Sequence, residues 1–466
     1  MKFLKPLDAA WLYAESRDTP MHVANLQIFS PPRNARPHFL QTLVARVKTT
    51  RSLAPPWNRR LRRLRRLRRL RRSPLRGVLP SWETDEDLDL DYHVRHSALP
   101  HPGGERELGV LVSRLHSHPL DFSRPLWECH IIEGLEGGRF ALYTKMHHAL
   151  VDGVGGMRMM QRSMSTSPRT RGFEPPWSIE HAAPKRAVTE AAVSTLEAAR
   201  GQLAALPEAA RVLVEVWRAK SHGDALEAPF AAPKSVLNGR VTAQRRFATQ
   251  QYPLARLKAI SKVADATLND VVLAISAAAL RRFLKEKNTL PRQSLTAGLP
   301  VSVRLRDDAE AGTAISFIIA CLATDRADPL RRLRAIQTST ARAKIHLQSL
   351  PRAALSSCTM MFMGPFIGEL VLGLGGVGRP MFNLTISNVP GPDQPMYLCG
   401  ARLEAMYPVS VLIHGQALNI TCVSYAGSLN FGFTGCRDTL PHMQRLAVYT
   451  GEALDELEAA LCKQWR

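Results

Sequence analysis

The alternation of apolar and polar residues predicts β-strands in both halves of the chain. Residues from Met21 to Phe29 follow the two-residue period of a strand. Trp127 to Glu133 and Phe140 to Lys145 are apolar runs joined by a glycine-bearing segment, Gly134 to Gly138, which predicts two paired strands. Phe382 to Phe433 contains further alternating runs divided by Pro and Gly turns, as expected for the strands of a sheet.

Helical spacing predicts helices between these strands. Thr267 followed by Asp270 has the spacing of a capping box, so Asn269 and Asp270 are expected in the first turn of a helix that runs to about Lys287. Backbone N–H groups are unpaired in such a turn, and the helix dipole there favours anions. Further helices are predicted at Phe39 to Val47, at Glu105 to His118, from Met157 onward and at Leu440 to Leu461.

The arrangement of these elements predicts two α/β halves and a linker. A chain of 466 residues can form two or three domains with sizeable cores. A polar, proline-bearing loop closes the first half, and residues 187–220 are rich in Ala, Glu, Leu and Val, which favours a helical linker. We therefore expect a first half at 1–180, a helical linker at 181–234 and a second half at 235–466.

Cysteine usage and the N-terminal sequence suit a cytoplasmic protein. Seven cysteines are scattered without a CxxC pair, which argues against a disulfide framework and against a zinc site. The N-terminus carries Asp8 and Glu15 among its apolar residues and lacks the continuous apolar segment of a signal peptide. Residues 353–368 form an uncharged stretch of 16 residues, shorter than the roughly 20 that a spanning helix needs, so a buried core helix is expected there. The methionine-rich cluster at 360–363 could also line a tunnel for an acyl chain.

A tract of arginine and leucine dominates the charge of the chain. The net charge is +22, and Arg59 to Arg72 contains ten arginines. Its leucines recur every three residues, so on a helix they would spiral around the axis instead of forming one stripe. A solvated repeat and a contact with a membrane or lipid-droplet surface both remain open. Nucleic-acid binding is not expected, because no recognition fold surrounds the tract.

The most specific chemical pattern is KMHHALVDG, from Lys145 to Gly153. Imidazole titrates near pH ~6.5 and can take a proton from a hydroxyl at neutral pH. Only one of two adjacent histidines can face a given side of a strand, so His147 and His148 are expected to have different roles. One ring and Asp152 can orient the other, and Gly153 permits a tight backbone path. An isolated pair would also suit a structural or metal-binding role, whereas the complete HHxxxDG pattern is more specific.

HHxxxDG resembles the signature of acyl-CoA-dependent acyltransferases that share a chloramphenicol-acetyltransferase-like fold with peptide-synthetase condensation domains. More closely, the chain resembles bacterial wax ester synthases/acyl-CoA:diacylglycerol acyltransferases. The resemblance extends from about residue 5 to about residue 455. It is carried, in order, by PLDAA at 6–10, PMHV at 20–23, PLW at 125–127, the histidine motif, NDVVL at 269–273, PVSVR at 300–304, Asn383 and SNVPGP at 387–392.

The resemblance implies an α/β fold of two chloramphenicol-acetyltransferase-like halves with the active site in a channel between them. It implies direct transfer of a long fatty acyl group from acyl-CoA to a fatty alcohol or to diacylglycerol. His148 would be the general base, with His147 and Asp152 as supports of the loop. No metal or redox cofactor is implied, because CoA carries the acyl group and is released. The sequence also lacks a GxSxG nucleophile elbow.

Other residues of these motifs are candidates to support the site. Asn269 could place a polar donor near the reacting carbonyl, or it could serve only at the helix start beside Asp270. Ser387 and Asn388 precede a rigid Pro-Gly-Pro turn that could bring them to the active site, or the turn could simply end a strand.

Two further motif residues have a favoured structural reading. Arg304 could touch the phosphates of CoA, although pairing with a core carboxylate is favoured. Trp127 is expected at a packing corner, with an exposed edge at the channel as the alternative. Two other activities stay open at this point: a condensation-type acyltransferase for a polar acceptor, and a non-enzymatic lipid-inclusion surface protein. As a fatty-acyl transferase or as a lipid-inclusion surface protein, the protein would be cytoplasmic and peripherally associated with the inner membrane or with lipid inclusions.

Overall fold

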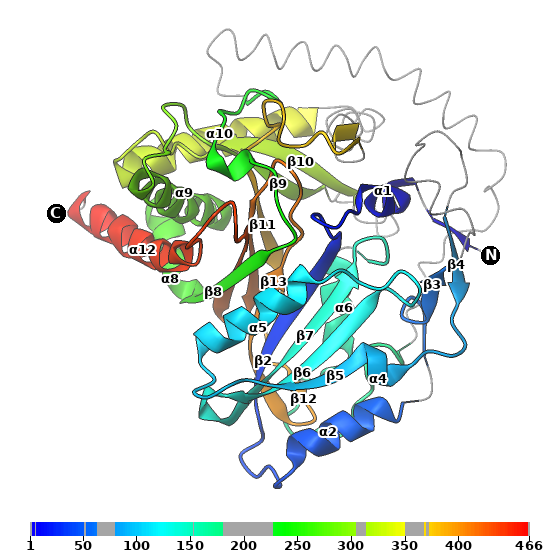
Figure 1. The fold of residues 1–466 in the computed structure, drawn as a ribbon. Helices are drawn as coiled ribbons and strands as arrows, with labels where there is room; N and C mark the ends of the chain where they lie inside the picture. The colour runs from blue at the N-terminus through cyan, green and yellow to red at the C-terminus, as the bar shows by residue number, and fades with distance from the viewer. Residues whose placement is uncertain are drawn as a thin grey trace.

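Two six-stranded β-sheets, each covered by helices, form the body of the protein (Figure 1). A small three-stranded sheet adds β1 (Lys2–Phe3), β4 (Ser81–Thr84) and β3 (Arg59–Leu61). The computed structural model describes residues 2–4, 6–50, 53–62, 80–151, 153–179, 227–303, 314–349, 368–369 and 372–464.

The first sheet carries the histidine motif. Its strand order is β12 (Tyr397–Leu398), β13 (Ala401–Val409), β2 (His22–Ser30), β7 (Arg139–His147), β6 (Trp127–Leu135) and β5 (Val94–Ala98). The hairpin of β6 and β7 is antiparallel and turns through η1 (Glu136–Gly138). The predicted pair of strands and their glycine-bearing turn are therefore confirmed.

Helices cover the two faces of the first sheet because apolar side chains alternate along its strands. One face packs against α2 (Phe39–Lys48) and α6 (Gly153–Arg162). The other face packs against α5 (Glu105–Ser117), whose Leu108, Leu111 and Val112 are buried. Two shorter helices, α1 (Pro6–Ala14) and α4 (Leu90–His93), complete this part of the chain.

The second sheet has a helical layer on one face. Its strand order is β10 (Ala314–Cys321), β9 (Thr296–Val303), β11 (Leu384–Pro390), β14 (Leu418–Tyr425), β15 (Ser428–Cys436) and β8 (Arg245–Pro253). A core of aliphatic and aromatic side chains joins this sheet to its helices. The helices are α8 (Leu254–Val263), α9 (Leu268–Glu286), α10 (Pro329–Ser349) and α12 (Arg445–Gln464), and a short turn, η2 (Val236–Asn238), precedes β8.

The two sheets are joined by shared elements as well as by contact. Strand β13 follows β11 in sequence, yet it pairs with β2 in the first sheet. Helix α5 of the first half covers the edge strand β8 of the second, because the Ser117 and Ser113 hydroxyls accept the backbone N–H groups of Arg245 and Phe247 at 2.9 Å each. Figure 1 shows α5 between the first sheet and β8.

The starts of α9 and α12 bear on two of the predicted helix boundaries. The capping box is present, since the Thr267 hydroxyl accepts the Asp270 N–H and the Asp270 carboxylate accepts the Thr267 N–H at the start of α9. The closing helix begins at Arg445 and not at Leu440, because residues 440–444 form turns.

Three predicted segments lie partly or wholly outside the described residues. Of the arginine–leucine tract, residues 59–61 form strand β3, in which Leu61 is buried, so the solvated reading is wrong for Leu61. Arg59 and Arg60 of the same strand are half-buried. Of the predicted linker, residues 227–234 contain no helix, and residues 180–226 lie outside the described ranges, as does the stretch 353–367.

No single helix of the described ranges is long and apolar enough to cross a bilayer. Helices α8 and α9 reach the length and apolar composition of a spanning segment only when taken together, and they are bent by 101° relative to each other.

Gly432→Ala is expected to destabilise the junction between the sheets. A Cβ at Gly432 of β15 would overlap the carbonyl oxygen of Pro408 in β13. Overpacking a close contact of this kind costs about 1–3 kcal/mol, so in a chain of this length the midpoint of thermal unfolding should fall by about 1–3 °C. The control is Gly172→Ala, since no atom lies within 4 Å of a Cβ built there. Equal midpoints for the two variants would contradict the prediction.

Candidate active site

The two motif histidines occupy different environments at the end of β7. His147 is the last residue of the strand and is fully buried, whereas His148 lies just beyond it and is half-buried. Backbone hydrogen bonds hold both positions: the His147 N–H donates to the Leu126 carbonyl at 3.0 Å, and the His148 N–H donates to the Met21 carbonyl at 2.8 Å. Only the His148 ring therefore has a surface that a substrate can approach.

The His147 ring is held by its own turn and by a carboxylate. Its Nδ1 accepts the backbone N–H of Ala149 at 3.0 Å, which leaves the ring proton of the neutral form on Nε2. Nε2 lies 3.4 Å from Glu15 Oε2, close enough for an electrostatic contact but without the alignment of a hydrogen bond. Phe122 packs edge-on against the ring at 5.7 Å. His147 therefore supports the turn from which His148 projects.

The His148 ring lies against an aromatic side chain from α1. Its ring stacks on that of Trp11 with centroids 4.2 Å apart and planes inclined by 17°. Glu15 is the residue that follows α1. Its carboxylate accepts the backbone N–H of Met21. Helix α1 and the start of β2 thus form one wall of the histidine site.

A buried charge cluster lies behind the histidines on β6 and β7. Glu128 Oε2 is 3.3 Å from Lys145 Nζ and 3.5 Å from His130 Nε2, while Glu128 Oε1 is 3.5 Å from Arg95. Burial alone would raise the pKa of the Glu128 carboxyl, but the hydrogen bond from His130 and the positive charges of Lys145 and Arg95 lower it to about 2. Glu128 is therefore a carboxylate at neutral pH.

Lys145 connects this cluster to the end of α5. Its ammonium donates to the carbonyls of Leu115 and His118 at 3.1 and 3.0 Å. These are carbonyl groups of the last turn of α5 and of the residue after it, where the helix dipole favours a cation. Burial still lowers the pKa of Lys145 below its ordinary value, although Glu128 opposes that shift. The surroundings therefore favour the charged form of Glu128, whereas burial disfavours the charged form of Lys145.

Two other histidines near the motif are structural. His22 pairs in register with His147, and its Nε2 donates to the His116 carbonyl at 2.9 Å. The His116 ring lies 2.9 Å from the Tyr143 hydroxyl and 3.1 Å from the Ser410 carbonyl, which belongs to the segment after β13. Burial lowers the pKa of His116 to about 3 and that of His22 well below its ordinary value. Both rings are neutral at pH 7. The His22 ring ties β2 to the end of α5, and the His116 ring joins the first half to the second through Ser410.

The candidates from the second half lie in its own sheet and helical layer. Asp270 is buried and accepts the Thr340 hydroxyl of α10 at 2.7 Å in addition to its capping bonds. Asn269 is half-buried in the same first turn of α9, which packs against α8, α10 and α12. Ser387 and Asn388 lie within β11, opposite Thr421 and Cys422 of β14. The contacts of Asp270 suit a structural role at the helix start.

Trp127 lies on the opposite face of the first sheet from His147. Its ring is fully buried, stacks on Trp177 and His93 at 5.0 and 4.4 Å, and meets Trp57 edge-on at 5.1 Å. Its Nε1–H donates to the Trp57 carbonyl at 2.8 Å. These contacts are those of a packing corner. Gly153 begins α6, whereas Asp152 and Arg304 lie outside the described residues.

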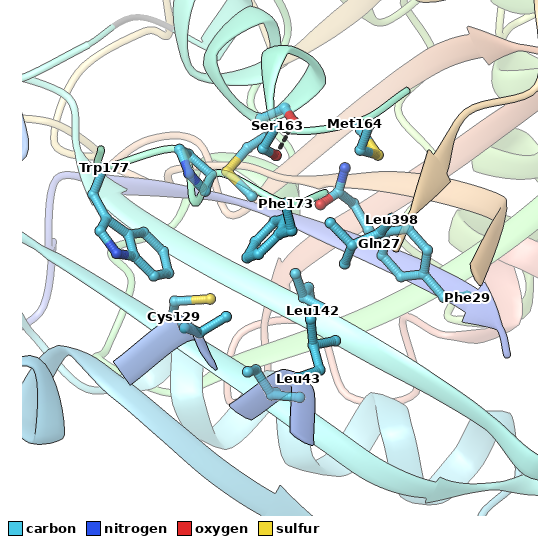
Figure 2. A pocket seen from close by; sticks show the side chains of 14 residues that line it. Gln27, Phe29, Leu43, Cys129, Leu142, Ser163, Met164, Phe173, Trp177 and Leu398 are labelled. Carbon is cyan, nitrogen blue, oxygen red and sulfur yellow. Dashed lines mark hydrogen bonds between the residues drawn. The ribbon is translucent and has the colours of Figure 1, made fainter. Parts of the chain in front are cut away.

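A narrow apolar cavity lies beneath α6 on this same face (Figure 2). Figure 2 shows Phe173 and Trp177 closing it against Leu142 and Cys129 of the sheet. The free space is about 10 Å³, which is room for roughly one water molecule. Methionine side chains line it at the end of α6, and such side chains repack readily. In the described ranges no three His, Cys, Asp or Glu side chains converge as metal ligands would.

Sequence reasoning missed the residues that surround the motif. Trp11 and Glu15 are far from the histidines in sequence, and nothing in the local pattern indicates their contacts. Lys145 and Glu128 did leave a signal, because each is a charged residue inside a predicted buried strand. Opposite charges on two neighbouring strands indicate a buried pair.

The overall fold is shared with a condensation domain of an antibiotic synthetase. The first condensation domain of the calcium-dependent antibiotic synthetase superposes with a TM-score of 0.57 at 18% identity, over 99% of this chain and 97% of that one. The two sheets therefore have the condensation-domain, chloramphenicol-acetyltransferase-like fold. This likeness concerns the fold alone.

Closer relatives define the family within that fold. A wax ester synthase/diacylglycerol acyltransferase from Marinobacter aquaeolei VT8 superposes with a TM-score of 0.79 at 36% identity, over 99% of this chain and all of that one. The O-acyltransferase WSD of Acinetobacter baylyi is 40% identical over 100% of this chain and 98% of its own length. A Mycobacterium tuberculosis protein named for diacylglycerol O-acyltransferase activity is 46% identical, over 98% of this chain and 97% of its own.

Family profiles cover most of the chain. The wax ester synthase/diacylglycerol acyltransferase catalytic domain matches residues 4–272, and the WS/DGAT C-terminal domain matches residues 311–458. The chain belongs to the wax ester synthase/diacylglycerol acyltransferase family, and it is an acyltransferase.

Glu128→Gln is expected to destabilise the first half at neutral pH. The variant leaves the Lys145 ammonium buried without its counter-charge, which typically costs about 3–5 kcal/mol in the free energy of unfolding. The folded-state pKa of Glu128 is about 2, below its ordinary value of 4.5. Its contribution is therefore complete above pH 4.5 and is lost as the pH falls toward 2.

Urea unfolding of the wild type and the variant between pH 7 and pH 3 would measure this difference. It should be largest at pH 7 and should shrink below pH 4.5. The double variant Glu128→Gln/Lys145→Met is the control, because it removes both buried charges and should recover part of the loss. A constant difference across the whole pH range would contradict the assignment.

Proposed function

We propose that this acyltransferase moves a long-chain fatty acyl group from acyl-CoA to the oxygen of a fatty alcohol, giving a wax ester, or of diacylglycerol, giving triacylglycerol. The observation that carries the proposal is the His148 ring, which is half-buried at the end of β7 and supported by the buried His147. Of the relatives that span almost the full chain, one is named for wax ester synthase and diacylglycerol acyltransferase activity and another for diacylglycerol O-acyltransferase activity.

The proposed reaction needs one base and no covalent enzyme intermediate. His148 takes the proton of the acceptor hydroxyl as its oxygen attacks the thioester carbonyl. The tetrahedral intermediate then expels the CoA thiolate, which receives the proton from His148. The new C–O ester bond replaces the broken C–S bond, and free CoA leaves. No metal or redox cofactor takes part in this scheme.

The surroundings of the motif suit apolar substrates. Trp11 presents an aromatic face beside His148, and α6 runs from the motif to the apolar cavity shown in Figure 2. An alkyl chain following α6 would bury its methylene groups at about 0.8 kcal/mol each. The lining methionines would have to move, because the closed cavity is too small for a chain.

His148→Ala should abolish most of the turnover. Loss of a general base typically lowers the rate by about 10²–10⁴-fold. The measurement is product chromatography after mixing purified protein with palmitoyl-CoA and either hexadecanol or diacylglycerol. Chromatography is preferable to a thiol dye, because the seven cysteines could react with the dye. The ratio of wax ester to triacylglycerol would give the acceptor preference.

The matched control is His101→Ala, which removes an exposed histidine of the same half. It should leave the product yield unchanged. Equal yields from His148→Ala and the wild type would remove His148 from its role. Absence of both products from the wild type would contradict the proposed substrates.

We further propose that the protein contacts an anionic lipid surface peripherally. The support is the net charge of +22, the ten arginines of residues 59–72 and three exposed apolar side chains, Leu372, Leu374 and Val377. Basic residues near anionic lipid gain about 1 kcal/mol each, and leucines can enter the interface.

Deletion of residues 63–72 should weaken binding to anionic vesicles by about tenfold or more. This deletion removes seven arginines and keeps strand β3. Co-sedimentation with phosphatidylcholine vesicles containing phosphatidylglycerol would measure it, with pure phosphatidylcholine vesicles as the control. Turnover of short-chain, soluble substrates should survive the deletion. A protein that acts only as a surface anchor would show no such turnover. Unchanged binding would contradict the proposal.

A further inference from the structure

Glu15 makes two contacts that converge on the histidine motif. It follows α1, and its side chain is 9% exposed. One carboxylate oxygen, Oε2, accepts the backbone N–H of Met21 and also lies 3.4 Å from His147 Nε2. Because Nδ1 of His147 accepts the Ala149 N–H, the ring N–H is on the side that faces Glu15. A negative charge at this place favours that ring orientation.

The peptide groups of Met21 connect Glu15 to His148. The Met21 N–H is held by the Glu15 carboxylate, and the Met21 carbonyl accepts the His148 N–H at 2.8 Å. Met21 is fully buried, and the next residue, His22, pairs with His147 in the β2–β7 ladder. A shift of the Glu15 carboxylate would therefore move the Met21 backbone, to which the His148 N–H is hydrogen-bonded.

Trp11 contacts the His148 ring directly, whereas Glu15 acts on His148 through the backbone. The stack of Trp11 on His148, at 4.2 Å and 17°, limits rotation of the imidazole about its side-chain bonds. Trp11 is itself packed beside Met21 and Ala14 at the end of α1. Helix α1 thus acts on His148 from two directions, through a ring contact and through a hydrogen-bonded peptide.

We propose that Glu15 and Trp11 are positioning residues for the histidine base, an inference that rests on the proposed function of His148. Glu15 holds the His147 ring and the backbone of Met21, whose carbonyl accepts the His148 N–H. Trp11 holds the plane of the His148 ring. A base contributes fully only when its nitrogen is within hydrogen-bond reach of the hydroxyl. Loss of either restraint should therefore slow the chemical step more than it weakens substrate binding.

Steady-state kinetics of Glu15 and Trp11 variants test this assignment. In Glu15→Ala and Trp11→Ala, kcat should fall by about 10²-fold, the effect of a misplaced reacting group, with KM for acyl-CoA and for hexadecanol within about twofold of the wild type. Glu15→Gln keeps an acceptor for the Met21 N–H, and Trp11→Phe keeps an aromatic face. Both should recover about tenfold of the lost kcat.

The matched control is Asp18→Asn, which removes one negative charge from an exposed side chain in the same α1–β2 turn. It should leave kcat and KM unchanged. Thermal unfolding of each variant would be measured beside the kinetics. If Glu15→Ala does not fold, the folded Glu15→Gln and Trp11→Phe variants decide the question through their own kcat.

Each outcome has one meaning. Lowered kcat with constant KM, partly restored by the conservative variants, supports the positioning role. A raised KM at constant kcat, or a kcat equal to that of Asp18→Asn, overturns it. His148→Ala runs in the same assay: if it loses turnover while the Glu15 and Trp11 variants keep theirs, only the positioning inference fails. If His148→Ala is fully active, the proposed base itself is wrong.

Discussion

Strand β2 is paired on both sides, and the site depends on that constraint. Its neighbours are β7, which ends at His147, and β13, which comes from the C-terminal part of the chain. A strand hydrogen-bonded on both edges cannot slip in register without reversing which side chains face the core. The pairing of His22 with His147 therefore fixes where the motif leaves the sheet. It also ties the second half to the first, because β13 packs on β15.

Buried charge and hydrogen bonds then refine the position that the sheet sets. Lys145 and Glu128 link β7 and β6 to the end of α5, and His116 links α5 to the segment after β13. Unpaired, each of these groups would be costly in the interior, so each favours one arrangement of strand and helix. His148 differs from these groups in being half-buried, and this partial exposure suits the proposed chemistry.

Local patterns predicted local structure well. The β6–β7 hairpin, helix α2 and the capping box of α9 each follow from residues that are close in sequence. The histidine motif predicted its own place at the end of a strand. Its partners Trp11 and Glu15 could not be predicted in this way, because their contacts arise only when α1 folds against the β2–β7 ladder.

Other features could not be predicted for the same reason of distance. The alternating segment from Phe382 to Phe433 indicates strands, but it does not indicate that β13 leaves its neighbours for the first sheet. The pattern of residues 59–61 resembles the rest of the arginine–leucine tract, yet pairing with β4 and a contact between Arg60 and Glu83 at 2.9 Å make them a strand. The environment of Asp152 and Arg304 stays a prediction.

The path of β13 has a consequence for synthesis on the ribosome. Strand β2 is synthesised several hundred residues before its partner at Ala401–Val409. Until then β2 has one unpaired edge, and an open edge is a template for wrong pairing with other chains. The first half therefore cannot complete its sheet until Ala401–Val409 has emerged, which is several hundred residues after β2 itself.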